Sequence, residues 1–180
     1  GENTDLTVDL PKNHIWQGGC EHTTKGLVFA ANIPTEEVFC MPYKYGVNGV
    51  LSSTMPLEYN GNIIDNFKFY FENGKIVSFE AEKGYATLEN LLSSDEASRY
   101  LGEVAIVPVS SPIYKTGLIF YNTLYDENAS CHFALGSAYP NCIENGEKMT
   151  KEEREKAGVN DSIIHVDFMV GNNKLSIIGE

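Results

Sequence analysis

Residues 67–79 read FKFYFENGKIVSF, and this stretch decides the fold class. Two runs rich in aromatic and β-branched residues flank Glu72-Asn73-Gly74-Lys75. Asn-Gly between two such runs is the strongest short-range signal of a β-hairpin, because both residues accept the positive φ angles that a tight turn needs. The pattern therefore predicts a hairpin within residues 63–82.

Working outward from this hairpin, alternation, apolar runs and capping signals predict the other elements. Strands are expected at residues 5–10, 26–31, 103–107, 118–121, 163–170 and 175–178, and helices at 86–92, 95–101, 126–138 and 150–157. Strands dominate, and helices are inserted between them without regular alternation. We therefore predict an α+β fold with a mixed, largely antiparallel sheet, in a single domain spanning residues 1–180.

Composition narrows the possible partners. The chain has 180 residues, with 25 acidic and 13 basic side chains, so its formal net charge is −12. Such a surface repels phosphate backbones and acidic lipid headgroups. No segment approaches the roughly 20 apolar residues that cross a bilayer. We expect neither nucleic acid nor membrane as a partner.

The four cysteines, at positions 20, 40, 131 and 142, form no C-x-x-C pair. Each is interpreted as a small buried hydrophobic residue in a reducing compartment, which favours the cytoplasm. The chain opens with Gly1-Glu2 and no initiator Met, which suggests a segment of a longer protein.

Two pairs of residues predict metal chemistry. In the strand expected at residues 163–170, His165 and Asp167 are at positions i and i+2 and share a face. Imidazole and carboxylate together suit zinc, cobalt or manganese, although Asp167 could instead only orient the imidazole. His132 and Tyr139 are seven residues apart in the helix expected at 126–138, so they would share one stripe. Alternatively, Tyr139 is an ordinary core residue of an amphipathic helix.

Three carboxylates complete the set of candidates. Glu103 enters an apolar strand, where a carboxylate is costly unless it is paired, protonated, bound to a cation or reached by solvent. Glu36 and Glu37 follow Pro34-Thr35, where the dipole of a short helix would also favour acids.

The sequence gives little support for nucleophilic catalysis or for other known enzyme motifs. Ser130-Cys131-His132 and Cys142 offer a nucleophile and a base without any known cysteine-enzyme signature. The chain contains no H-E-x-x-H, P-loop or G-x-G-x-x-G motif. No motif therefore supports a zincin metalloprotease, a P-loop nucleotide-binding protein or a dinucleotide-binding protein.

Five ordered blocks of sequence carry a resemblance to a known family. They are PTEEVF at 34–39, YLGEVA at 100–105, FYNTLYDENASCH at 120–132, ALGSAYP at 134–140 and NDSIIHVDFM at 160–169. Together they resemble the thermophilic-type metallo-aminopeptidases, the aminopeptidase T and aminopeptidase S group. The resemblance covers nearly the whole chain.

The resemblance implies a cytoplasmic peptide hydrolase with two divalent metal ions, which would be zinc, cobalt or manganese. Its metal ligands would fall on Glu37, Glu103, His132, Tyr139, His165 and Asp167. The substrates would be peptides with a free N-terminus, from which the first residue is removed, and Glu36 would carry the proton to the leaving amine.

Family members are longer and carry an amino-terminal half, and the full-length form is expected to be a homodimer. This chain would be the metal-binding C-terminal catalytic part of such an enzyme, poorly active by itself. The alternative is a metal-binding or structural module without turnover.

Overall fold

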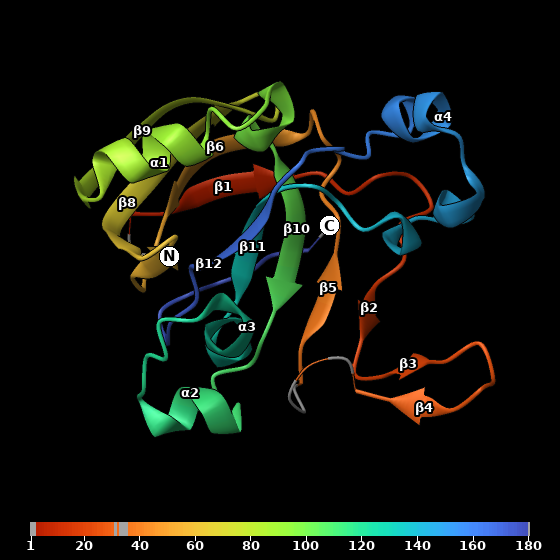
Figure 1. Cartoon of the computed structure of the whole chain (residues 1–180), viewed down its shortest axis with the longest axis horizontal. Helices are drawn as coiled ribbons and strands as arrows, with labels where there is room; N and C mark the ends of the chain where they lie inside the picture. Colours follow the sequence, from red (N-terminus) through yellow and green to blue (C-terminus); the bar gives the residue numbers. More distant parts are fainter. Residues whose placement is uncertain (1–2, 31, 33–35, 180) are drawn as a thin grey trace.

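The computed structural model describes residues 3–30, 32 and 36–179, and it contains two five-stranded antiparallel sheets that share one core (Figure 1). The first sheet has the order β1-β6-β8-β7, with β9 paired to β8. Its strands are β1 (Asp5–Val8), β6 (Val47–Ser52), β7 (Leu57–Tyr59), β8 (Asn62–Glu72) and β9 (Lys75–Lys83). The second sheet has the order β12-β11-β10-β5-β2. Its strands are β2 (Gln17–Gly18), β5 (Val38–Cys40), β10 (Leu101–Ile106), β11 (His132–Gly136) and β12 (His165–Met169).

The predicted hairpin is confirmed as β8 and β9, joined at Asn73 and Gly74. Their φ angles are 48° and 82°, in the left-handed region that Asn and Gly tolerate best. A Cβ atom on Gly74 would lie 1.8 Å from the carbonyl oxygen of Lys44, so no other residue fits this turn without moving the backbone.

One face of the second sheet packs against the first sheet. The ring of Phe168 on β12 lies 5.6 Å from the ring of Phe67 and 5.3 Å from that of Phe69, both on β8. Phe133 and Val166 point to the same side, in the same buried cluster. Because side chains alternate along a strand, the neighbouring positions of β10, β11 and β12 lie on the opposite face, which carries the site described below.

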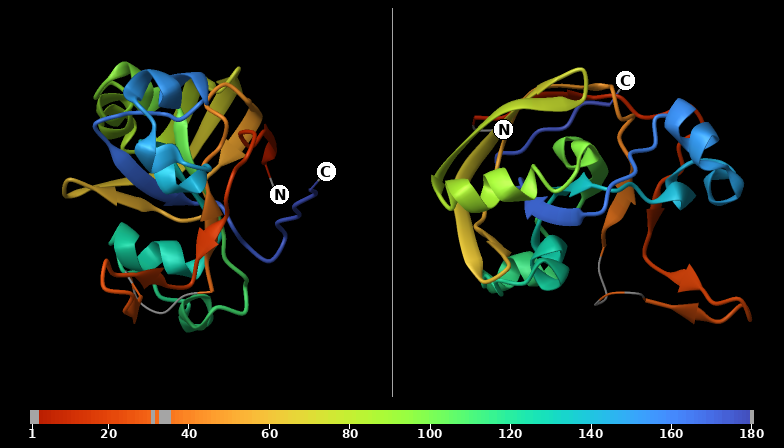
Figure 2. Two further views of the ribbon diagram at one scale, coloured as in Figure 1. Left: turned by 90° about the vertical axis from the view of Figure 1, so that its right-hand side faces the viewer. Right: turned by 45° about the horizontal axis from the view of Figure 1, so that its top comes forward.

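Eight short helices connect the strands among the described residues. They are α1 (Tyr85–Leu91), η1 (Glu96–Arg99), α2 (Pro112–Thr116), α3 (Thr123–Asp126), η2 (Glu127–Ala129), η3 (Pro140–Cys142), η4 (Gly146–Lys148) and α4 (Lys151–Lys156). Figure 1 and the right-hand view of Figure 2 show α1 and α4 on opposite sides of the molecule. The capping box of α4 is present as predicted: Thr150 accepts from the N–H of Glu153, and Glu153 accepts from the N–H of Thr150. The predicted α+β class is confirmed.

The helix predicted at residues 126–138 is wrong. Helical structure ends with η2 at Ala129, and residues 132–136 form β11 in the middle of the second sheet. Every residue of β11 is buried, because the strand is covered on both faces. Such a strand has no polar side, so its sequence lacks the alternation that distinguishes a strand from a helix.

Other predicted elements also differ from the structure. Residues 118–121 and 175–178 form no strand. The helix predicted at 95–101 is the single 3₁₀ turn η1, which ends before β10 begins at Leu101. Of the strand predicted at 26–31, only β4 (Val28–Phe29) forms, paired with β3 (Glu21–His22), and residue 31 lies outside the described residues. Cys20 is exposed, whereas Cys40, Cys131 and Cys142 are buried as expected.

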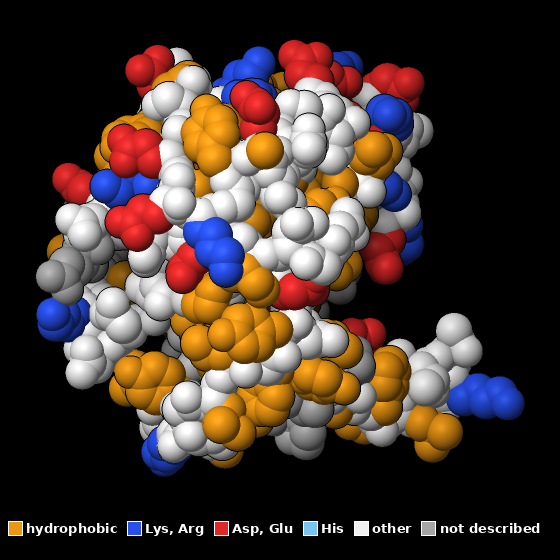
Figure 3. All heavy atoms as spheres, turned by 60° about the vertical axis from the view of Figure 1, so that its left-hand side comes forward, with side chains coloured by type: hydrophobic (Ala, Val, Ile, Leu, Met, Phe, Trp, Pro, Cys, Tyr) orange, Lys and Arg blue, Asp and Glu red, His pale blue; other side chains and the backbone are white. Residues whose placement is uncertain are grey.

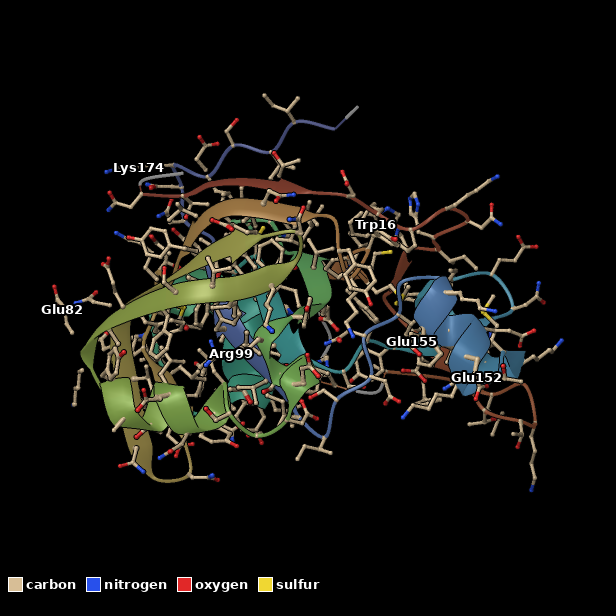
Figure 4. All side chains as sticks on the ribbon, turned by 90° about the horizontal axis from the view of Figure 1, so that it is seen from above. Trp16, Glu82, Arg99, Glu152, Glu155 and Lys174 are labelled. Atoms are coloured by element: carbon tan, nitrogen blue, oxygen red, sulfur yellow. The ribbon has the colours of Figure 1, made fainter. Side chains whose placement is uncertain are left out.

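Several charged side chains lie on the outer surface of the molecule. In Figure 4, Glu82, Glu152 and Lys174 point outward, away from the two sheets. None of the helices in the described part of the chain is both long and apolar enough to cross a membrane.

Candidate metal centre

The register of the second sheet gathers polar residues on one face. Glu103 on β10 is opposite Ala134 on β11, and Ala134 is opposite Asp167 on β12. His132 and His165 lie on the same face, paired with Ala105 and Gly136 respectively. Ala105, Ala134 and Gly136, which pair with these residues, have small side chains or none.

A first triad forms around His132. Its Nε2 atom lies 3.1 Å from Oε1 of Glu37 and 3.3 Å from Oε1 of Glu103. His132 and Glu103 are buried, and Glu37, immediately before β5, is half-buried.

A second triad forms around His165. Its Nε2 atom lies 3.4 Å from Oδ1 of Asp167 and 3.7 Å from Oε2 of Glu103. Glu103 therefore directs one carboxylate oxygen to each triad. In each triad, one ligand atom from every residue lies within 4.8 Å of the others, a spacing that a single metal ion can span.

The second nitrogen of each imidazole fixes the orientation of its ring. Nδ1 of His132 lies 3.0 Å from the carbonyl oxygen of Ser130, and Nδ1 of His165 lies 2.7 Å from that of Ser137. A carbonyl oxygen can only accept, so each Nδ1 carries a proton and donates it. In a neutral ring, Nε2 then presents its lone pair to the carboxylates, the tautomer that a metal-binding histidine requires.

The pKa values of the histidines reflect this crowding of acids. Burial alone would lower the pKa of His132, but the adjacent carboxylates of Glu103 and Glu37 raise it well above its usual value. For His165, burial also acts to lower the pKa, and Asp167 and Glu103 raise it to about 9. Without another cation, the cluster therefore draws protons onto both rings.

The pKa values of the two carboxylates Glu103 and Asp167 are shifted in opposite directions. Burial raises the pKa of Glu103, and the charge of Asp167 adds to the increase. The pKa of Asp167 is lowered, because its contacts with His165 outweigh the effect of burial.

The residues fit a divalent metal centre. Within the described part of the chain, Nε2 of His132 is buried and has no hydrogen bond of acceptable geometry, although two carboxylate oxygens lie beside it. A buried nitrogen in this position, surrounded by acids that repel one another, is stabilised best by a cation. Imidazole and carboxylate ligands suit zinc, cobalt and manganese.

Glu127 belongs to this cluster and was missed by the sequence analysis. It hydrogen-bonds to Asp167. Burial and then the charge of Asp167 raise its pKa to about 8, so it is the protonated donor in that bond at neutral pH. It also accepts from the amide of Asn32. No sequence pattern marked Glu127, because Asp126-Glu127 matches an ordinary helix start.

The other two predicted residues lie at the edge of the cluster. Tyr139 is not on a helix with His132, as predicted, but follows β11 immediately before η3. Its ring lies 4.8 Å from the ring of His165. Burial, Glu103 and Asp167 raise its pKa to about 12. The side chain of Glu36 is exposed, next to Glu37 in sequence.

Comparison with known proteins identifies the family. Residues 1–180 match the family described as thermophilic metalloprotease (M29). The chain belongs to this M29 family. It is 56% identical to Aminopeptidase AmpS of Bacillus subtilis (strain 168) over 178 residues, which is 99% of this chain and 43% of the relative. It is also 56% identical to Aminopeptidase 2 of Geobacillus stearothermophilus over 174 residues, 97% of this chain and 42% of the relative.

A solved structure has the same fold over most of this chain. Wild-type AmpT from Thermus thermophilus superposes with a TM-score of 0.87 at 45% sequence identity, covering 94% of this chain and 42% of that one. The chain thus spans less than half the length of these relatives.

Proposed function

We propose that this chain is the metal-binding part of a metal-dependent aminopeptidase, which removes the N-terminal residue of peptides at a dinuclear centre. The observation that carries the proposal is the position of Glu103, whose two oxygens face separate triads. A carboxylate shared in this way would supply one oxygen to each of two ions. The M29 family, a metalloprotease family, supports a peptidase function.

In this proposal, each triad holds one ion. Glu37, Glu103 and His132 would hold the first ion, and Glu103, His165 and Asp167 the second. Tyr139 is proposed as a further ligand, because its ring is packed against that of His165. Zinc, cobalt and manganese all suit these donors.

Two bound divalent ions would polarise the scissile carbonyl, activate a water molecule at neutral pH and capture the free amine of the substrate. The chain's own residues supply the remaining functions. The carbonyl groups of Ser130 and Ser137 orient the two imidazoles. Glu36, exposed beside Glu37, is proposed to carry a proton to the leaving amine.

The proposal also covers the substrates, the cellular location and the oligomeric state. Peptides with a free N-terminus are the proposed substrates, because the names of the relatives describe aminopeptidases. A cytoplasmic location is also proposed, and the four cysteines, all of them free thiols in the structure, support it. The full-length form is proposed to be a homodimer.

An activity assay with a matched variant tests the catalytic proposal. The chain is incubated with Zn²⁺, Co²⁺ or Mn²⁺ and an aminoacyl chromogenic substrate, with Aminopeptidase AmpS as the positive control. We expect metal-dependent release of the chromophore, and its loss in His165→Ala. The control is His22→Ala, because His22 is exposed on β3, outside the cluster.

The substrate control is the same compound acetylated on its amine, which should not be cleaved. Metal binding without turnover, with the positive control active, would support the non-catalytic module. Equal activity of His165→Ala and the wild-type chain would contradict the proposed site.

A further inference from the structure

Asn160 is a buried polar residue that lies outside both triads. Figure 3 shows charged side chains spread over the surface of the molecule, on the face that it draws, whereas Asn160 is 1% exposed. Its Nδ2 atom donates to the carbonyl oxygen of Gly136 at 2.6 Å and to that of Ala97 at 2.8 Å. A carbonyl oxygen can only accept, so these two bonds fix the orientation of the side-chain amide.

The amide oxygen of Asn160 has no such bond. Oδ1 is buried and has no hydrogen-bond partner in the part of the chain that the structure describes. A buried acceptor without a partner costs free energy, and such a group in a folded protein calls for an explanation. The benefit of Asn160 therefore lies in the two carbonyl groups that its Nδ2 atom holds.

Asn160 holds the chain on both sides of Ser137, whose carbonyl oxygen accepts from Nδ1 of His165 at 2.7 Å. On one side, the side chain of Asn160 binds the carbonyl group of Gly136. On the other side, its backbone carbonyl oxygen accepts from the N–H of Ala138 at 2.9 Å. The pairing of β11 with β12 ends at Gly136, so the sheet itself does not hold Ser137.

The backbone around Ser137 is closely packed. Its N–H donates to the carbonyl oxygen of Ile164 at 2.7 Å. Gly136 has a φ angle of 96°, and a Cβ atom on it would lie 2.2 Å from that same oxygen. A Cβ atom on Gly102, at the register shift between β10 and β11, would lie 2.2 Å from the carbonyl oxygen of Ser137. A side chain at either glycine would displace this backbone, so the carbonyl group of Ser137 has a defined place.

We propose that Asn160 is a positioning residue for His165 and, through His165, for the second ion of the dinuclear centre. By fixing the backbone around Ser137, Asn160 sets the carbonyl oxygen that orients the imidazole of His165. The other nitrogen of that ring, Nε2, then faces Asp167 and Glu103. The part that concerns the ion rests on the proposed function, whereas the orientation of the ring can be tested in the metal-free chain.

The first ion should not depend on Asn160. The imidazole of His132 is oriented by the carbonyl oxygen of Ser130, whereas Asn160 bonds to residues 97, 136 and 138. A loss confined to the second ion therefore distinguishes the proposed role from a general loosening of the fold.

Calorimetric titration with Zn²⁺ and NMR of the histidine ring protons test this inference in the full chain. Asn160→Ala removes both donated bonds and should lower the affinity for the second ion at least about tenfold, since loss of a group that orients a metal ligand costs about 10–100-fold. The affinity for the first ion should stay unchanged. Asp167→Asn, which removes a ligand of the second ion alone, identifies that ion in the titration. In the metal-free Asn160→Ala chain, the Nδ1 proton of His165 should exchange with water faster than in the wild type.

Ser98→Ala is the matched control. Ser98 is 0% exposed and caps η1, the helix that Asn160 also contacts through Ala97. Loss of this cap loosens η1 and removes no bond to the segment around Ser137, so both ions and the His165 proton should behave as in the wild type. Asn160→Ser removes the same two bonds as Asn160→Ala, because its side chain is too short to reach both carbonyl groups, and should give the same selective loss.

Unchanged affinity for both ions with unchanged proton exchange in Asn160→Ala would overturn the inference, as would an equal loss at both ions or the same loss in Ser98→Ala. Failure of both Asn160 variants to fold would also overturn it, because Asn160 would then serve the whole fold. A wild-type chain that binds fewer than two ions would contradict the proposed dinuclear centre. Exchange of the Nδ1 proton would still decide whether Asn160 positions His165.

Discussion

Glu103 is the residue on which both halves of the cluster depend. It is 5% exposed, and its two oxygens lie 3.3 Å from Nε2 of His132 and 3.7 Å from Nε2 of His165. Removing its charge should therefore affect both ions, whereas Glu37 and Asp167 each contact one histidine.

Charge-neutral variants separate these contributions. Glu103→Gln should abolish binding of both ions, and Asp167→Asn should abolish binding of one, because an amide is a poor ligand beside a buried imidazole. Calorimetric titration with Zn²⁺ measures the stoichiometry. Two ions still bound by Glu103→Gln with unchanged affinity would contradict the shared role of Glu103.

Proton release is a second prediction at this scale. In the metal-free chain, His165 has a pKa of about 9 and Glu127 a pKa of about 8, so both are mostly protonated at pH 7. Metal binding must displace protons from the cluster. The affinity for metal should therefore fall, as the pH is lowered, by up to about tenfold per pH unit for each proton displaced. Calorimetry in buffers of different ionisation enthalpy counts the protons, and a count of zero at pH 7 would refute this interpretation.

The raised pKa of His165 also makes the folding stability of the metal-free chain depend on pH. The raised pKa of His165 stabilises the metal-free chain fully below its reference value of 6.5, and this contribution is lost as the pH rises through about 9. Thermal unfolding in a chelator across this range should show the loss, and His165→Ala should reduce it.

Among the elements, the β8–β9 hairpin and β11 show what the sequence could and could not predict. The β8–β9 hairpin was predictable because Asn73-Gly74 is a local signal. The shared face of His165 and Asp167 was predictable because it needs only strand periodicity. β11 was mistaken for a helix because both of its faces are buried, and Glu127 was missed because only the fold brings η2 to β12.

A substitution on β11 tests which face of the second sheet carries the metal ligands. Ala134 lies in register between Glu103 and Asp167, so Ala134→Val adds bulk between the ligands. It should weaken metal binding about tenfold or more, with a stability cost of about 1–3 kcal/mol from overpacking. Val166→Ile on the opposite face is the control, because it adds bulk to the core and should leave metal affinity unchanged. Equal effects of the two variants on zinc titration would contradict this assignment of faces.

At the scale of the whole molecule, the cluster brings together residues from several elements. Its members come from β10, β11, β12, η2 and the residue before β5, so the repulsion between their carboxylates acts against the folded chain. Bound cations would offset that repulsion and stabilise the fold by mass action.

Metal removal should therefore lower the thermal stability of the chain. At a free metal concentration one hundred times Kd, binding adds about 2.7 kcal/mol per site, which corresponds to roughly 5–10 °C in Tm for a chain of this size. Calorimetric scans with and without a chelator measure the difference, and Glu103→Gln should show none. A wild-type Tm that is the same in both conditions would contradict a metal centre linked to folding.

Anomalous X-ray diffraction from crystals soaked in Zn²⁺ or Co²⁺ tests the central claim most directly. The account predicts two peaks about 3.5–4 Å apart, one in each triad, with Glu103 between them. A single peak, or two peaks that do not share Glu103, would contradict it.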